Sequence, residues 1–324
     1  MKVRNIGTIM LAFMLGMPAS VGAQAQTWPQ KPIRFVVPAS AGGATDLGAR
    51  VVAEHLSRAL GTPVVVENRA GATGAIGMAE VARSAPDGYT VLIAPDLVTT
   101  IKLTQKDAAV DIVRDFAAVT QIAIQPLVIA AHESLGVSTL QELIKLAKAK
   151  PGTIAYSSSG TGSTHHLAGE LFARMAGISL VHVPYKGSSD AFKDLIGGQI
   201  PLGVIGSSVL VPYLNDKRLR LLAVTPGTRS TTFPGIPTMI ESGFKGFDVK
   251  TWLGALVHVK TDPAIVARLN TEIRRTLEMP EVRTKLAGAS LEVAGNSTTE
   301  FAAIIKEDVE RWTRLVTESK LKLQ

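Results

Sequence analysis

The sequence predicts an α/β protein built from two domains. Apolar strand segments alternate with amphipathic helix segments from residue 31 to 97, and a second alternating series runs from about 138 to 224. In each series a glycine-rich turn, at 38–46 and at 157–164, joins a strand to a helix. The N-terminus of a helix leaves backbone N–H groups unpaired and carries about half a positive charge, so it binds small anions. The two turns therefore indicate two domains that hold one acidic ligand.

The first series has the order strand, helix, strand, helix, strand. Its first strand, Ile33–Val37, is a continuous apolar run of the kind that parallel sheets bury. Apolar residues at helical spacing over 49–60 end at a glycine, which is typical of a helix stop. Strands at 64–66 and 90–94 surround a helix at 75–82. This order predicts a parallel sheet with right-handed crossovers.

A long apolar stretch at 119–131 is expected to cross from the first domain to the second. Beyond it, Ser138-Thr139-Leu140-Gln141 fits a capping box that begins a helix. A further helix is expected at 165–175, directly after the second glycine turn, and another at 188–196. The strands expected in this series are 154–156, 180–183, 202–205 and 221–224.

The C-terminal segment is expected to return to the first domain. A strand at 252–257 leads to Asp262 and Pro263, which suit the N-cap and the first position of a helix. Two C-terminal helices follow, the last from about 299 to 316. The expected domains are 26–124 together with 251–324, and 125–250.

The first 25 residues are typical of an export signal. Lys2 and Arg4 precede an apolar run at 6–17, and Ala23-Gln24-Ala25 fits a small-x-small cleavage site, so we expect cleavage near Ala25. The apolar run is too short to span a bilayer, and an uncleaved anchor is the alternative. Cleavage would lower the formal net charge from +7 to +5, because two basic and no acidic residues leave.

Composition excludes several classes of function. The charge is mild and scattered, and aromatic residues make up 5% of the chain. Nucleic-acid binding needs a concentrated basic surface, usually with aromatic side chains for stacking, so we expect no nucleic-acid partner. The chain has no cysteine, which excludes disulfides, a thiol nucleophile and a thiolate metal site.

The first glycine turn suits a ligand that approaches the backbone closely. Gly42 and Gly43 present no side chain, and Thr45 adds a hydroxyl donor. Asp46 would repel an anion unless it accepts backbone N–H groups within the turn, or unless it holds a water or a ligand amine. An ordinary capped turn is the alternative. The turn lacks the glycine spacing of a dinucleotide-binding loop and the Gly-Lys-Ser/Thr of a phosphate-binding loop.

The second glycine turn is unusually rich in hydroxyl groups. Six of the eight residues at 157–164 are Ser or Thr, and Gly160 and Gly162 stand among them. One helix cap does not require so many donors, whereas a carboxylate that has lost its water does. The turn therefore favours carboxylate binding, and a flexible serine-rich loop is the alternative.

The histidines and serines of this turn raise two enzymatic possibilities. His165 and His166 point about 100° apart on a helix, so they do not chelate one metal ion, and we expect no metal. We expect His166 to cap the turn or to donate to the ligand, and His165 to pack or to be exposed. Neither Ser159 nor Ser163 lies in the Gly-x-Ser-x-Gly elbow of many serine hydrolases. The members of a triad can lie anywhere in the sequence, so an exported serine hydrolase with one of these serines as nucleophile remains the alternative function.

Several stretches resemble the solute receptors of tripartite tricarboxylate transporters, also called Bug receptors. The resemblance runs from about Trp28 to the helix around Trp312. The stretches that carry it are WPQKPIR at 28–34, the first turn up to Asp46, VENRAG at 66–71, APDGYT at 85–90, SSGTGS at 158–163 with His166-Leu167, HVPYKG at 182–187, GGQ at 197–199, and 234–243.

This resemblance implies a type II periplasmic binding protein fold, in which two α/β domains enclose a ligand cleft. It implies a periplasmic, monomeric receptor without cofactor or catalysis, which captures a small organic acid by hinge closure and hands it to membrane permease subunits. A ligand-sensing module for a signalling partner is a further alternative. The ligand-binding residues that the resemblance implies are Ala41, Gly42, Gly43, Thr45 and Asp46 in the first turn, and Ser159, Gly162, Ser163, Thr164 and His166 in the second.

The chain departs from the family pattern in two places that border the cleft. After Asp96 the family usually has a Ser/Thr-rich stretch and then Asn-Pro, and here residues 97–102 differ. Pro201 stands where an acidic residue is usual, and Ser207 where a polar or acidic contact is common. We expect the far end of the ligand to lie against these segments, with Ser207 and, from the HVPYKG stretch, Tyr185 at its border.

Overall fold

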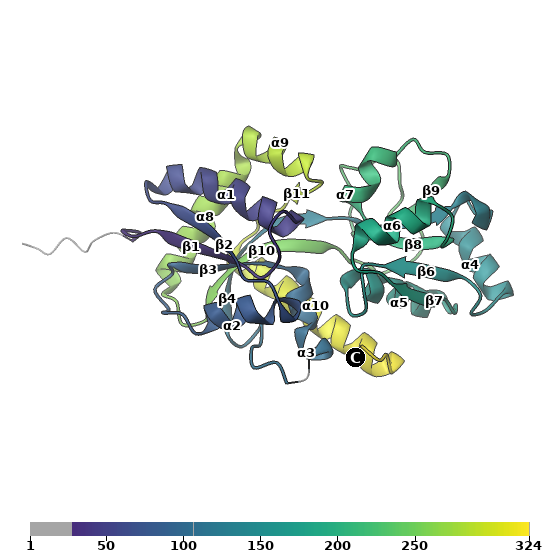
Figure 1. Cartoon of the computed structure of the whole chain (residues 1–324), viewed down its shortest axis with the longest axis horizontal. Coiled ribbons are helices and arrows are strands. Elements are labelled where there is room, and N and C mark those ends of the chain that lie inside the picture. Colours follow the sequence, from purple (N-terminus) through teal and green to yellow (C-terminus); the bar gives the residue numbers. More distant parts are fainter. Residues whose placement is uncertain (1–27, 106, 324) are drawn as a thin grey trace, which may run out of the picture.

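Two β-sheets, each covered by helices, form two lobes joined by extended strands (Figure 1). The computed structural model describes residues 28–105 and 107–323. The expected export signal and its cleavage site near Ala25 lie outside the described residues. None of the described helices is long and apolar enough to cross a membrane.

The first lobe contains a six-stranded sheet of order β11-β4-β10-β3-β1-β2. Pairing of β1 with both β2 and β3 is parallel, which confirms the predicted strand–helix repeat. Strand β10 is antiparallel to its neighbours β3 and β4, so the returning chain lies in the middle of the sheet. The strands are β1 (Ile33–Val37), β2 (Val64–Asn68), β3 (Thr90–Pro95), β4 (Phe116–Gln125), β10 (Thr251–His258) and β11 (Glu292–Val293).

Helices cover both faces of this sheet. They are α1 (Ala44–Leu60), α2 (Ala75–Ala82), α3 (Ile101–Thr104), α8 (Pro263–Glu278), α9 (Pro280–Gly288) and α10 (Thr298–Ser319), with the 3₁₀ turns η1 (Ala72–Gly74) and η2 (Asp96–Thr100). The C-terminal segment has three helices where two were expected. Met279 adopts an extended conformation and Pro280 begins a new helix, because proline cannot continue the preceding one.

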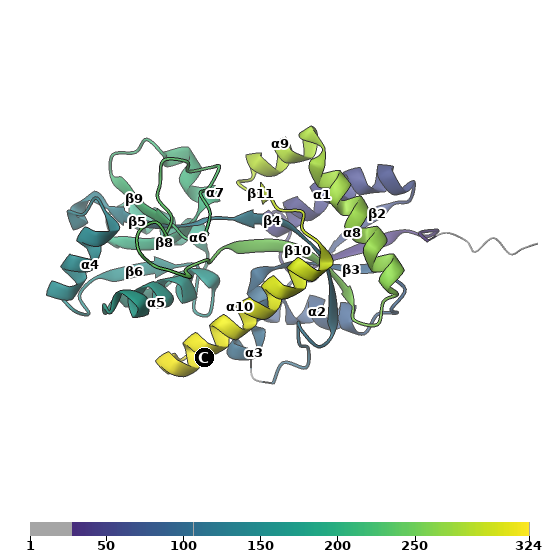
Figure 2. The ribbon, with the colours of Figure 1, turned by 180° about the vertical axis from the view of Figure 1, so that it is seen from behind.

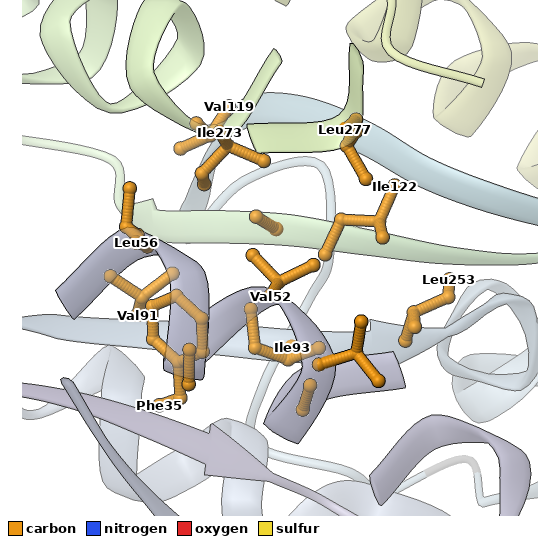
Figure 3. Close-up of a cluster of buried hydrophobic side chains, with 14 of the residues drawn as sticks. Phe35, Val52, Leu56, Val91, Ile93, Val119, Ile122, Leu253, Ile273 and Leu277 are labelled. Atoms are coloured by element: carbon orange, nitrogen blue, oxygen red, sulfur yellow. The ribbon is translucent and has the colours of Figure 1, made fainter. Parts of the chain in front are cut away.

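The core of the first lobe fills the space between the sheet and the helices α1 and α8 (Figure 3). Phe35 and Val91 of the central strands meet Val52 and Leu56 of α1 there. These are the apolar positions that the sequence places at helical spacing and in continuous runs. Each such side chain stabilises the fold by about 1.5–3 kcal/mol when it leaves water.

The second lobe contains a five-stranded sheet of order β7-β6-β8-β5-β9. Its elements are β5 (Leu127–His132), η3 (Glu133–Leu135), α4 (Leu140–Ala149), β6 (Ala155–Ser158), α5 (Thr164–Ala176), β7 (Val181–Pro184), α6 (Ser188–Ile196), β8 (Leu202–Gly206), α7 (Ser207–Leu210), η4 (Val211–Tyr213) and β9 (Leu219–Val224). The predicted capping box is wrong by one residue. Thr139 caps α4 by accepting from the Glu142 N–H, and the Glu142 carboxylate accepts from the Ser138 N–H at 2.7 Å.

Two strands and one helix connect the lobes. The chain enters the second lobe at Pro126, between β4 and β5, and returns through β10. Helix α10 begins on the first lobe and runs obliquely toward the second (Figure 2). Trp312 and Leu315, near its end, are buried in the core of the second lobe, and Glu318 pairs with Arg174 of α5. The end of α10 therefore packs on the lobe opposite to its beginning.

Candidate functional site

A cavity of about 170 Å³ lies between the two lobes. Strands β1, β3 and β6 end beside it, and ligands of parallel α/β sheets bind at such carboxyl ends. Its size is below the roughly 300–1,000 Å³ of sites for drug-sized molecules. The residues that line it are Ala44, Thr45, Pro95, Asp96, Gln125, Thr251, Trp252, Leu253 and Leu291 from the first lobe and its crossing strands, and His165 from the second.

The first glycine turn brings the start of α1 to this cavity. Gly43 is the N-cap residue, in an extended conformation, and no side chain caps the helix. Ala44 and Thr45, the first two helical residues, line the cavity, whereas Ala41, Gly42 and Gly43 are exposed. Gly42 has a φ of +84°, which favours glycine. An uncapped helix N-terminus thus faces the space between the lobes.

Asp46 holds the first turn together. Its carboxylate accepts from the Gly42 N–H at 2.9 Å, from Asn68 Nδ2 at 3.0 Å and from Arg50 Nε at 3.1 Å. Burial by itself would raise the pKa of Asp46, but these hydrogen bonds lower it below its ordinary value. Asp46 therefore remains ionised and stabilises the turn by accepting a backbone N–H group. This is one of the roles that the sequence allowed for an acid at an anion site.

The hydroxyl groups of the second turn mostly bind to the turn itself. Ser163 is the N-cap of α5: its Oγ accepts from the His166 N–H at 3.2 Å and donates to the Gly160 carbonyl at 2.6 Å. Ser159 Oγ lies 2.9 Å from His165 Nδ1. Ser158 Oγ also lies 2.7 Å from His182 Nε2 of β7, and the Thr164 hydroxyl donates to Asp96 of the other lobe.

The two adjacent histidines face opposite sides. His165 lines the cavity, and burial lowers its pKa to about 4, so it is neutral at pH 7. His166 turns into the second lobe, where its Nδ1 accepts from the Gly162 N–H at 3.1 Å and its ring stacks on His182 at 3.8 Å between centroids. His166 therefore caps the turn, which is one of its two expected roles. His165, and not His166, lines the cavity.

The pair of Ser159 and His165 does not form a catalytic triad. The second ring nitrogen of His165 lies 3.0 Å from Ser188 Oγ, so a hydroxyl rather than a carboxylate orients the ring. A serine nucleophile needs a histidine that an acid orients and whose imidazolium it stabilises. The geometry therefore argues against the hydrolase alternative.

Tyr185 and Ser207 do not reach the cavity. The Tyr185 hydroxyl donates to Asp194 at 2.7 Å, and burial together with this bond raises its pKa to about 12. Ser207 is fully buried and donates to the Ser290 carbonyl of the first lobe at 3.3 Å. Ser207 therefore contacts the other lobe rather than the cavity.

Asp96 and Gln125 line the cavity but are absent from the predicted site. Asp96 follows β3 at the sheet edge where the first glycine turn follows the neighbouring strand β1, and this shared position was the available signal. Gln125 ends the crossing strand β4, and its Nε2 is buried without a hydrogen-bond partner among the described residues. Neither residue belongs to a glycine-rich motif that the sequence would mark.

The lobes are in contact on both sides of the cavity. On one side Thr164 donates to Asp96, and on the other Glu292 of β11 accepts from Ser230 Oγ at 2.6 Å and from Thr232 Oγ1 at 2.9 Å. These bonds join side chains that belong to different lobes. The two lobes are therefore in direct contact around the cavity.

Two α/β lobes, two crossing strands and a cavity between the lobes at helix N-termini define a binding protein with the type II periplasmic fold. Residues 48–321 match the model of the tripartite tricarboxylate transporter family receptor. The chain belongs to this family.

Relatives and solved structures agree with this assignment. The chain is 35% identical over 312 residues to Protein BugT of Bordetella pertussis, which covers 95% of both chains. It is similar to the structure of R. palustris Rpa4515 with adipate, at 32% identity and a TM-score of 0.75, over 90% of this chain and 98% of that one. It is also similar to MatC from Rhodopseudomonas palustris with bound malate, at 26% identity and a TM-score of 0.72, over 89% of this chain and all of that one.

The family assignment bears on two of the predictions. The family consists of substrate-binding receptors, so the chain is a binding protein and not an enzyme. Receptors of this family are periplasmic, which agrees with the expected export.

Proposed function

We propose that this protein captures a small organic acid between its lobes in the periplasm and delivers it, as a monomer, to the membrane subunits of a tripartite tricarboxylate transporter. The observation that carries the proposal is the uncapped N-terminus of α1 at the cavity between the lobes. All lining residues except His165 come from the first lobe and its crossing strands. The acid therefore binds to the first lobe before the second closes over it by a hinge motion.

The cavity favours an anion without using a basic side chain. None of its ten lining residues is Lys or Arg, and His165 is neutral at pH 7. The backbone N–H groups of Ala44 and Thr45 belong to the first turn of α1, where the helix supplies its positive end. A carboxylate bound there replaces its lost water by charge-assisted hydrogen bonds, each of which contributes about 1.5–3 kcal/mol.

The ligand class follows from the size of the cavity and its second donor. Gln125 Nε2 supplies a buried N–H group that no described residue uses, so the ligand needs a second acceptor. Adipate and malate, which accompany the two similar structures, are both small dicarboxylates. We therefore assign the ligand to the small dicarboxylates, with one carboxylate at α1 and the other within reach of Gln125.

Calorimetry with two isosteric variants tests this assignment. A thermal-shift screen of dicarboxylates of four to six carbons first identifies the acid that binds most tightly. Thr45→Val and Gln125→Met each remove a donor while keeping most of the side-chain volume, and each is expected to weaken binding about 10-fold. Thr271→Val, on the exposed face of α8, is the control and leaves the affinity unchanged. Failure of every acid to bind, or unchanged affinity in both site variants, would reject the proposal.

A further inference from the structure

We propose that Asp96 makes this receptor select an acid that carries an ammonium or hydroxyl group beside its carboxylate. The inference rests on the proposed function, because it describes the ligand of the same cavity. Asp96 begins η2, directly after β3, and it is 7% exposed. It lines the cavity together with Thr45 of α1 and His165 of α5.

The carboxylate of Asp96 retains acceptor capacity toward the cavity. One oxygen accepts from the Thr164 hydroxyl, and the other accepts from the Trp252 N–H at 3.4 Å. An ionised carboxylate has about four acceptor positions, so these two donors leave about half of them open. Both donors are neutral, and a buried carboxylate with neutral partners alone gains from a further donor or a cation.

The surroundings of Asp96 supply no positive charge. The cavity has neither Lys nor Arg in its lining, and His165 of α5 is neutral at pH 7. On the side of α10, Asp308 adds a like charge, although Asp308 is itself paired with Arg311 at 3.0 Å and bonded to Trp252 Nε1 at 2.9 Å. Burial, followed by this like charge, raises the pKa of Asp96 to about 7. A donor or cation on the ligand is the partner that the site lacks.

Acids with and without such a donor are expected to change the protonation of Asp96 differently when they bind. The negative charge of a plain dicarboxylate would raise the pKa of Asp96 further, so Asp96 would take up a proton when the acid binds. An ammonium group that donates to Asp96 offsets this charge, stabilises the ionised form and lowers its pKa, so protons are released on binding near pH 7. A hydroxyl donor, which adds no charge, reduces the proton uptake. The affinity for an ammonium-bearing acid therefore rises from pH 6 to pH 8, and that for a plain dicarboxylate falls.

Matched acids distinguish these cases by calorimetry. Succinate, malate and aspartate share a four-carbon chain and differ in carrying no donor, a hydroxyl or an ammonium; glutarate, 2-hydroxyglutarate and glutamate extend the series. Each is titrated at pH 7 in phosphate and in Tris, whose different ionisation enthalpies report the protons exchanged. We expect malate or aspartate to bind about 10-fold or more tightly than succinate, with protons released when aspartate binds and fewer taken up with malate than with succinate.

Two carboxyl-to-amide variants separate the effect of Asp96 from that of burial alone. Asp96→Asn keeps the shape of the side chain and removes the charge, and it is expected to bring succinate and the donor-bearing acids within about 2-fold of each other. Asp308→Asn changes another buried carboxyl that does not line the cavity; it removes a like charge near Asp96 but leaves the Asp96 carboxylate in place, so it keeps the preference. If Asp96→Asn fails to fold, the pH dependence of wild-type binding between pH 6 and pH 8 tests the role of the Asp96 carboxylate.

The outcomes separate this inference from the proposed function. Succinate binding as tightly as malate and aspartate, or protons taken up with every acid, overturns the selectivity and leaves a dicarboxylate receptor. A preference that survives in Asp96→Asn overturns the role of Asp96. If no acid of either chain length binds, both the dicarboxylate assignment and this inference are rejected.

Discussion

Replacing Gly162 with alanine is expected to weaken ligand binding about 30-fold. Gly162 lies in the second glycine turn, and a Cβ there would stand 2.5 Å from Thr104 Cγ2 on α3 of the first lobe. Because this contact joins the two lobes, we expect it to form only when they close on each other. Overpacking of this kind costs about 2 kcal/mol, which is about 30-fold in the affinity of a ligand that requires closure. Calorimetry measures the affinity, and small-angle scattering with and without the acid measures the closure of the lobes.

Two further variants separate the clash from backbone strain. Gly162 has a φ of +76°, so alanine also strains the turn in the open form. Gly177→Ala, at the end of α5, meets the same strain with φ of +62° and no atom within 4 Å of the new Cβ, so it lowers stability but not affinity. Thr104→Ser keeps the hydroxyl and removes the methyl group, and in combination with Gly162→Ala it should restore most of the binding. Wild-type affinity in Gly162→Ala would contradict the closure mechanism.

Gly254→Ala is expected to lower the free energy of unfolding by about 3 kcal/mol. Gly254 lies in β10, in the middle of the first sheet, and a Cβ there would stand 2.1 Å from Phe301 of α10. Phe301 is fully buried and packs edge-on against Trp252 at 5.1 Å between centroids, so its ring has no free space to move into. Urea denaturation measures the loss.

The control for Gly254→Ala is the same substitution at a glycine that has open space around it. Gly288→Ala, at the end of α9, places its Cβ where no atom lies within 4 Å, and it should change the free energy of unfolding by less than about 0.5 kcal/mol. Phe301→Leu should recover part of the stability of Gly254→Ala, because it replaces the ring with a smaller side chain. If Gly254→Ala unfolds at the same urea concentration as the wild type, the close packing of α10 on β10 is wrong.

Local patterns were sufficient to predict most of the secondary structure. The strand Ile33–Val37 and the helix Ala75–Ala82 occur with the predicted bounds, because apolar runs, helical spacing and glycine stops are all local signals. The two glycine turns likewise begin helices that approach the same cavity. The strand–turn–helix unit therefore predicted the parallel strand pairs of the two mixed sheets and the approximate place of the cavity.

The side chains of the cavity depend on long-range topology. Asp96, Gln125 and Thr251 are distant in sequence and meet only because β3, β10 and β4 are neighbours in one sheet. The sequence also did not predict that His165 rather than His166 lines the cavity. Both histidines lie at the start of a helix that has polar groups around it on both sides. Residue type alone did not indicate which histidine lines the cavity.

A crystal structure with the tightest-binding acid of the dicarboxylate screen tests the central claim most directly. We predict one carboxylate in the cavity between the lobes, with an oxygen about 2.7–3.2 Å from the backbone nitrogen of Ala44 or Thr45. A larger groove of about 650 Å³ lies between α8 and α10, on the first lobe alone. An acid bound in that groove, or held between the lobes with its carboxylates away from α1, would contradict the claim.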